Sequence, residues 1–67
     1  MLSESEILSI IQDAVDYGVQ SLNGQKSVMS LQIASFWLDG YIVGMKGNIK
    51  DYDVCTLKAT LNNYYFF

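Results

Sequence analysis

The chain has 67 residues, 51% of them hydrophobic, and it carries four lysines, no arginine and seven acidic residues, for a net charge of −3. A domain this small is marginally stable without disulfides, metals or association. One cysteine and no histidine exclude an internal disulfide and the usual zinc ligand sets. Without clustered basic side chains we expect no direct nucleic-acid binding, so association with another protein is the expected source of stability.

The first predicted element is a helix that begins after Ser3. Ser3 and Glu6 have the spacing of a capping box, in which each side chain accepts from the other residue's backbone N–H. Leu2 and Ile7 occupy the two positions of a hydrophobic staple. Apolar residues then recur at helical spacing until the Asn-Gly pair at 23–24, which supplies a stop signal.

The second predicted helix, Val28 to Met45, is apolar nearly all the way round, which indicates a helix surrounded by protein or lipid. Gly40 and Gly44 lie four residues apart on one face, although glycine lowers helix propensity. Close approach of another helix is the reason that we expect, because no Cβ would separate the two backbones. The short connector at 25–27 predicts that the first two helices are antiparallel neighbours.

The third segment, Ile49 to Phe67, fits two patterns. A helical stripe continues through Val54, Leu57 and Leu61, whereas the stretch 55–61 also alternates between apolar and polar residues, as a strand before a turn would. We favour a helix, because an isolated two-stranded hairpin is marginally stable. The expected fold class is therefore all-α, a single domain over 1–67 built as a small dimeric bundle of two to three helices. The alternative is an α+β fold with a C-terminal hairpin.

The acidic residues and the cysteine are the candidate catalytic and metal-binding groups, and each has a simpler explanation. Asp13 and Asp16 fall on the polar face of the first helix. Asp51 and Asp53 suit the start of a helix and lack the other ligands of a calcium loop. Without a histidine to activate it, Cys55 is expected to be a small buried residue. We therefore predict no catalytic, cofactor-binding or metal site, and no enzyme.

Aromatic residues and one aspartate mark the predicted interface. Protein interfaces are enriched in Tyr, Trp and Phe, and an ordinary chain end frays, so aromatic residues there suggest docking on another chain. The alternative is packing within the monomer. Asp39 lies in the most apolar segment and needs either the surface or a basic partner. The predicted interface residues are Phe36, Trp37, Asp39, Gly40, Tyr41, Gly44, Tyr64, Tyr65, Phe66 and Phe67.

The segment Trp37 to Gly44 resembles a helix with the pattern Trp/Cys-x-x-Gly-Tyr-x-x-Gly, which occurs in small periplasmic acid-stress chaperones and some secretion-system immunity proteins. The resemblance covers eight residues. Those families carry signal peptides and paired cysteines that have no counterpart here, so it implies no function for this chain.

Localisation and function are expectations from the whole profile. The second helix approaches the length of a membrane span, but its central aspartate disfavours insertion, and no basic region precedes an apolar run, so we expect a cytoplasmic protein. The expected function is a small non-catalytic regulator or inhibitor that binds another protein and itself. The composition suits a phage or mobile-element protein of the anti-defence, anti-CRISPR-like type. The alternatives are an accessory subunit of a larger complex and a small membrane-active protein.

Overall fold

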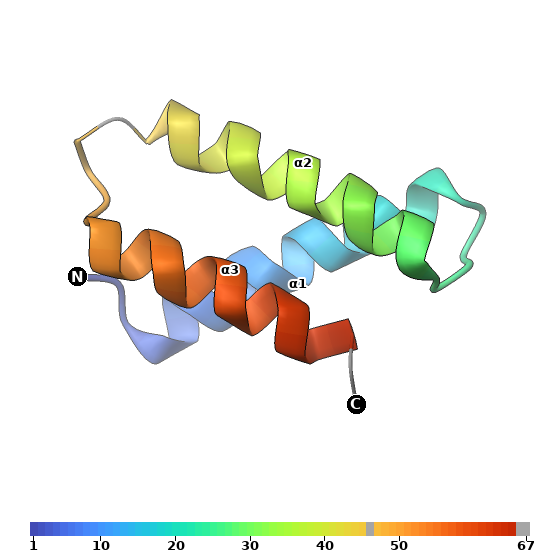
Figure 1. Cartoon of the computed structure of the whole chain (residues 1–67), viewed down its shortest axis with the longest axis horizontal. Helices are drawn as coiled ribbons and strands as arrows, with labels where there is room; N and C mark the ends of the chain where they lie inside the picture. Colours follow the sequence, from blue (N-terminus) through green and yellow to red (C-terminus); the bar gives the residue numbers. More distant parts are fainter. Residues whose placement is uncertain (46, 66–67) are drawn as a thin grey trace.

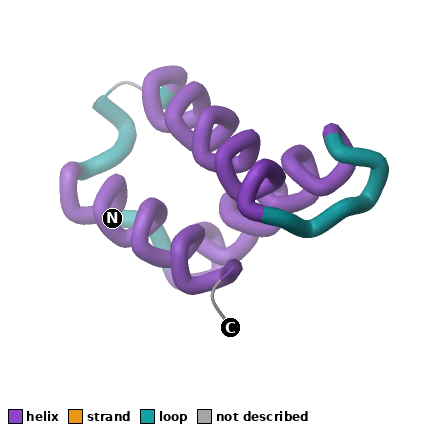
Figure 2. Tube along the Cα trace, turned by 45° about the vertical axis from the view of Figure 1, so that its right-hand side comes forward, coloured by secondary structure: helices purple, strands orange, loops and turns teal. Residues whose placement is uncertain are grey.

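The fold consists of three helices joined by short connections. The computed structural model describes residues 1–45 and 47–65, the side chain of Tyr65 excepted. Helix α1 spans Glu4–Ser21, α2 spans Val28–Gly44 and α3 spans Asp51–Tyr65. Antiparallel α1 and α2 form a hairpin, and α3 runs beside α1 and α2 with its start close to the N-terminus (Figures 1 and 2). No described residue lies in a strand, so the all-α prediction is confirmed; association into dimers stays a prediction.

Capping boxes start both helices of the hairpin. In α1, the Glu6 backbone N–H donates to Ser3 Oγ at 3.1 Å and the Ser3 N–H donates to Glu6 Oε1 at 3.0 Å, which confirms the predicted box. In α2, Ser27 and Ser30 exchange the same two bonds, at 3.3 and 2.8 Å. The sequence interpretation missed the second box, because the usual partner at that position is Glu or Gln rather than the shorter Ser.

The predicted stop of α1 is a left-handed turn. Asn23 and Gly24 have φ values of 56° and 88°. The Gly24 N–H donates to the Val19 carbonyl at 2.9 Å and the Asn23 N–H to the Gln20 carbonyl at 3.2 Å. These two bonds satisfy carbonyls that the end of the helix leaves open, and they turn the chain towards α2.

The core lies where the three helices meet. Ile11 of α1, Leu38 of α2 and Leu57 of α3 are each at most 1% exposed. The remaining buried apolar residues of the core are Ile10, Ala14, Val15, Ala34 and Leu61. All three helices therefore contribute side chains to one shared core.

The burial pattern of α3 separates the two interpretations of the third segment. Leu57 and Leu61, four residues apart, are buried, whereas Cys55 and Ala59 are exposed. A strand would place all four on one face, but a helix turns Cys55 about 200° away from Leu57. The helical prediction is therefore confirmed. The expectation that Cys55 is buried is wrong, because at that position it faces solvent.

A close approach between α1 and α2 involves a glycine that the sequence interpretation did not single out. A Cβ placed on Gly18 of α1 would collide with the backbone carbonyl oxygen of Ser30 at the start of α2. A Cβ on Gly40 or Gly44 would meet nothing within 4 Å. Within the described chain, the contact that needs a glycine is thus at Gly18. Close packing at Gly40 and Gly44 stays a prediction for contact with a second chain.

The capping box of α1 predicts a pH dependence. The pKa of the Glu6 carboxyl is lowered from its ordinary value of 4.5, first because the Ser3 backbone N–H donates to it and second because the Ser3 side chain does. A carboxyl whose pKa is lower in the folded state adds stability above its unfolded-state pKa and loses it as pH falls through the folded one.

Because Gln keeps a hydrogen-bond acceptor but not the charge, we expect Glu6→Gln to destabilise the protein at neutral pH, and we expect the difference from the wild type to shrink as the pH falls below the ordinary glutamate pKa of 4.5. Chemical unfolding at a series of pH values measures the difference. Glu4→Gln removes a neighbouring charge but leaves the box intact, so it is the matched control. An equal pH dependence of the two variants would contradict a role for the capping bond.

Candidate functional site

The candidate site is the face of α2 that points away from the core. Helix α2 is apolar nearly all round, but the chain's own core fully buries only Ser30, Ala34 and Leu38 of it. On the opposite side, Phe36 is 76% exposed, Val43 64% and Met29 60%. We define the outer α2 face as Met29, Ile33, Phe36, Gly40 and Val43.

The spacing of the outer α2 face has a regular period. Its five positions are separated by four, three, four and three residues, which is the a/d repeat that one helix presents to another. None of the five residues is charged. In Figure 1, α1 lies behind α2 and α3 lies below it, so the other two helices approach α2 from these directions only. We expected protein or lipid to surround α2, but within the described chain only the side of α2 that faces the core is covered.

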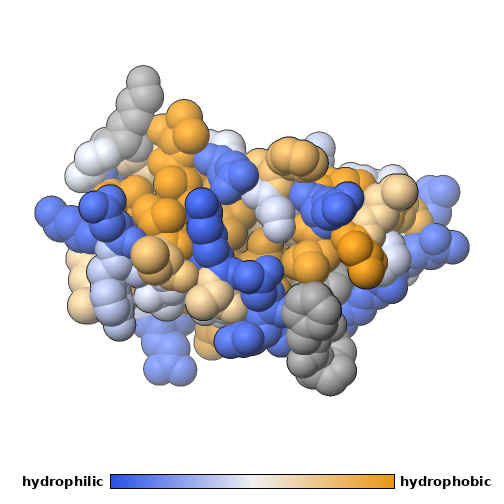
Figure 3. Space-filling view, in the orientation of Figure 1, coloured by the Kyte–Doolittle hydropathy of each residue, from blue (hydrophilic) through white to orange (hydrophobic). Residues whose placement is uncertain are grey.

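The visible surface is a mixture of apolar and polar areas rather than a uniform polar coat. In Figure 3, apolar side chains gather in two areas over α2 and α3, with hydrophilic residues between them. Among the described residues, the exposed large apolar side chains of α2 are Val28, Met29, Phe36, Tyr41 and Val43. Three of these side chains, Met29, Phe36 and Val43, share the outer α2 face, and exposed apolar side chains that gather on one face mark binding sites in soluble proteins.

The aromatic residues predicted for the interface divide between surface and core. Phe36 projects outward, whereas Trp37 is half-buried and packs against the core. Trp37 and Tyr41, one turn apart, stack with ring centroids 5.3 Å apart and planes at 22°. Aromatic pairs of this kind contribute about 0.5–1.5 kcal/mol beyond the area that they bury. Phe36 is therefore the aromatic residue of α2 that is most available to a partner.

Asp39 lies at the edge of a groove between α2 and α3. Its carboxylate is 3.9 Å from Lys58 Nζ, and both side chains are more than half exposed, at 59% and 58%. Such a pair contributes little to stability. The groove encloses about 260 Å³ and is lined by Ser35, Leu38, Asp39, Lys58, Leu61 and Asn62. Asp39 therefore reaches the surface, which is one of its two expected placements, and contact with a basic residue of a partner protein stays a prediction.

The aromatic C-terminus is partly integrated into the fold. Tyr64 Oη donates to Gln12 Oε1 of α1 at 3.1 Å, and Lys26 Nζ lies 5.3 Å from the centre of the Tyr64 ring. Tyr64 therefore holds α3 against α1 and the α1–α2 loop. The predictions for the side chain of Tyr65 and for Phe66 and Phe67 fall outside the described residues.

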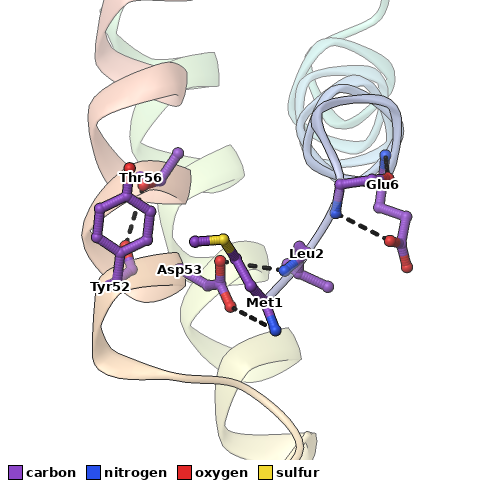
Figure 4. A network of polar contacts seen from close by, with 7 residues as sticks. Met1, Leu2, Glu6, Tyr52, Asp53 and Thr56 are labelled. Carbon is purple, nitrogen blue, oxygen red and sulfur yellow. Dashed lines mark hydrogen bonds and ion pairs between the residues drawn. The ribbon is translucent and has the colours of Figure 1, made fainter.

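Asp53 has a role that the sequence interpretation did not identify. It is 1% exposed, and its Oδ1 accepts the Leu2 backbone N–H at 3.2 Å while its Oδ2 lies 4.0 Å from the Met1 amino group. Figure 4 shows this carboxylate between α3 and the N-terminal segment. Asp53 shares the helical face of Leu57, four residues on. That spacing was the available signal that this aspartate, unlike Asp51, points inward.

The remaining acidic residues form no constellation. Asp13 is exposed, and Asp16 accepts a hydrogen bond from Gln12 Nε2 at 2.8 Å on the exposed face of α1. Over residues 1–45 and 47–65, no three acidic or cysteine side chains gather where a metal ion would fit. In the same residues, no helix combines the length and the apolar character that a membrane crossing requires.

These features define the chain as a small three-helix, all-α protein with an apolar helix face that the other described residues leave exposed. Comparisons with protein families, with curated proteins and with solved structures give no match to it.

Proposed function

We propose that this chain is a small non-catalytic regulator or inhibitor that acts by binding another protein through the outer α2 face. The observation that carries the proposal is the exposure of Phe36, Val43 and Met29 on the side of α2 opposite the core. Leaving large apolar side chains in water forgoes roughly 1.5–3 kcal/mol of burial each. A partner that covers this face recovers that stabilisation.

Phe36 is the expected energetic centre of the binding surface. It occupies the middle of the outer α2 face, with Met29 one heptad before it and Val43 one heptad after it. Central aromatic residues that become fully desolvated dominate the binding energy of most interfaces. Flanking polar residues such as Gln32 and Asp39 would then form the rim.

The test compares two exposed aromatic residues. We expect the tagged wild-type chain to capture a target protein from its native cell, and Phe36→Ser to lose it, whereas Tyr52→Ser on α3 retains it. Tyr52 is 66% exposed and lies off the outer α2 face, which makes it the matched control. The activity of the purified target, with and without the chain, then shows inhibition or regulation. Equal capture by both variants would contradict the proposed surface.

The anti-defence label is a narrower form of the same proposal. It rests on the small size, the acidity and the arginine-free composition of the chain. Expression of the chain in a bacterium that restricts a phage should restore infection if the target is a defence protein, and Phe36→Ser should not. If a panel of defence systems restricts the phage equally with and without the chain, the anti-defence proposal is wrong, whereas the proposal of protein binding is unaffected.

An accessory subunit of a larger complex is the second candidate. The same apolar face supports it, since permanent interfaces are more hydrophobic than transient ones. The two candidates differ in the behaviour of the isolated chain. A free regulator unfolds cooperatively on heating and stays dispersed, whereas a permanent subunit aggregates or lacks a cooperative transition when it is purified alone.

A further inference from the structure

We propose that a second copy of this chain occupies the outer α2 face, so that two α2 helices pack against each other along it. The inference rests on the proposed function in one respect, namely that this face is a binding surface. It adds the identity of one partner, and it makes self-association and target binding compete for the same side chains.

The period of the face favours a helical partner. Met29, Phe36 and Val43 recur every seven residues, and Ile33 and Gly40 fall between them at the intermediate positions of the repeat. Two helices whose apolar residues follow this repeat interlock at a shallow crossing angle of about 20°. A second copy supplies a helix with the same length and period, and a two-fold axis pairs the two faces without further adaptation.

The charges around the face also favour a second copy. No residue of the outer α2 face is charged, so pairing two of them buries no ion. The one charged residue within α2, Asp39, has Lys58 of its own chain 3.9 Å away, which offsets its repulsion of the second copy's Asp39. A basic or an acidic target helix would find no complementary charge on the five positions themselves.

The small area of the face is typical of a weak association. With roughly 150–200 Å² for a large apolar side chain, the exposed fractions of Met29, Phe36 and Val43 correspond to about 300–400 Å² per chain. Two copies then bury about 600–800 Å² from these residues, and neighbouring side chains add to it. Stable complexes bury about 1,200–2,000 Å², so this dimer belongs to the weak, reversible class. We expect a dissociation constant in the micromolar range or above.

Sedimentation equilibrium of the purified chain over a range from about 1 μM to 1 mM tests the proposal. The wild type should move reversibly from monomer to dimer mass. Phe36→Ser should raise the dissociation constant at least about tenfold, and Val43→Ser should do so to a smaller extent. Tyr52→Ser should not change it. Because Phe36 and Val43 are exposed, circular dichroism of the dilute variants should show wild-type helix content and melting, and Val43→Ser serves if Phe36→Ser misfolds.

Two results would overturn the second copy as the occupant. One is a wild-type chain that remains monomeric throughout the concentration range. The other is a dimer whose dissociation constant is the same in Phe36→Ser and Tyr52→Ser, since that dimer uses another surface. The two proposals can fail separately. If the chain stays monomeric but captures a target through Phe36, self-association alone is overturned. If the chain forms a dimer that depends on Phe36 but no target binding depends on Phe36, the proposed function alone is overturned.

Discussion

Replacing Leu57 with alanine should lower the free energy of unfolding by about 2–5 kcal/mol, the usual range for a leucine removed from a packed core. Leu57 is fully buried in α3, among core residues of α1 and α2. A domain of this length has a total stability of roughly 3–10 kcal/mol. The variant should therefore lose a large share of its stability, and urea unfolding followed by circular dichroism measures the loss.

The matched control is Cys55→Ala, two residues earlier in the same helix. Cys55 is exposed, so its replacement should change the stability by no more than about 0.5 kcal/mol. The pair of variants tests the helical assignment of the third segment, because a strand would place both residues on one face. Similar destabilisation by the two substitutions would contradict the helix.

Gly18→Ala should destabilise the protein even though alanine is the better helix former. Its Cβ would collide with the Ser30 carbonyl oxygen, which is backbone and cannot swing aside as a side chain can. The two helices must then separate, and overpacking of this kind costs typically about 1–3 kcal/mol or more. We expect a net loss of at least about 1 kcal/mol in urea unfolding, and a larger loss for Gly18→Val.

Gly40→Ala is the opposite case and the control for Gly18→Ala. Its Cβ meets open space, so the monomer should gain roughly 0.8–1 kcal/mol from the helix propensity of alanine. The measurement is made on dilute protein, below the concentration at which the proposed dimer forms. The two glycine-to-alanine substitutions bring the same gain in helix propensity, but their effects on the free energy of unfolding should thus have opposite signs. A loss at Gly40 in the dilute protein would place an unrecognised contact at that position.

The local signals of the sequence predicted the helices well, because they act between residues a few positions apart. The Ser3–Glu6 box and the Asn23–Gly24 stop bound α1 where expected. For α3, periodicity alone left two options, and the choice depended on which residues the other two helices cover. Leu57 and Leu61 are covered and Cys55 is not, which is information about tertiary packing rather than about α3 itself.

The candidate site was harder to predict, because it depends on how the helices are arranged. The spacing of Gly40 and Gly44 predicted a close helix contact there, yet the close contact within the chain is at Gly18, which is the single glycine of α1. Asp53 was interpreted as helix-start chemistry, but its carboxylate is buried against the N-terminal segment. An aromatic cluster on α2 was expected, but the sequence did not show that Phe36 faces water while Trp37 faces the core.

The hydrogen bond from Leu2 to Asp53 has a consequence for the order of folding. It joins residues that are 51 positions apart, so the entropy of closing that loop opposes its early formation. The α1–α2 hairpin, by contrast, has local bonds at both ends of its connecting loop and can form first. In native-state hydrogen exchange we therefore expect the facing amides of α1 and α2 to exchange most slowly, and those of α3 to open as a separate, less stable unit.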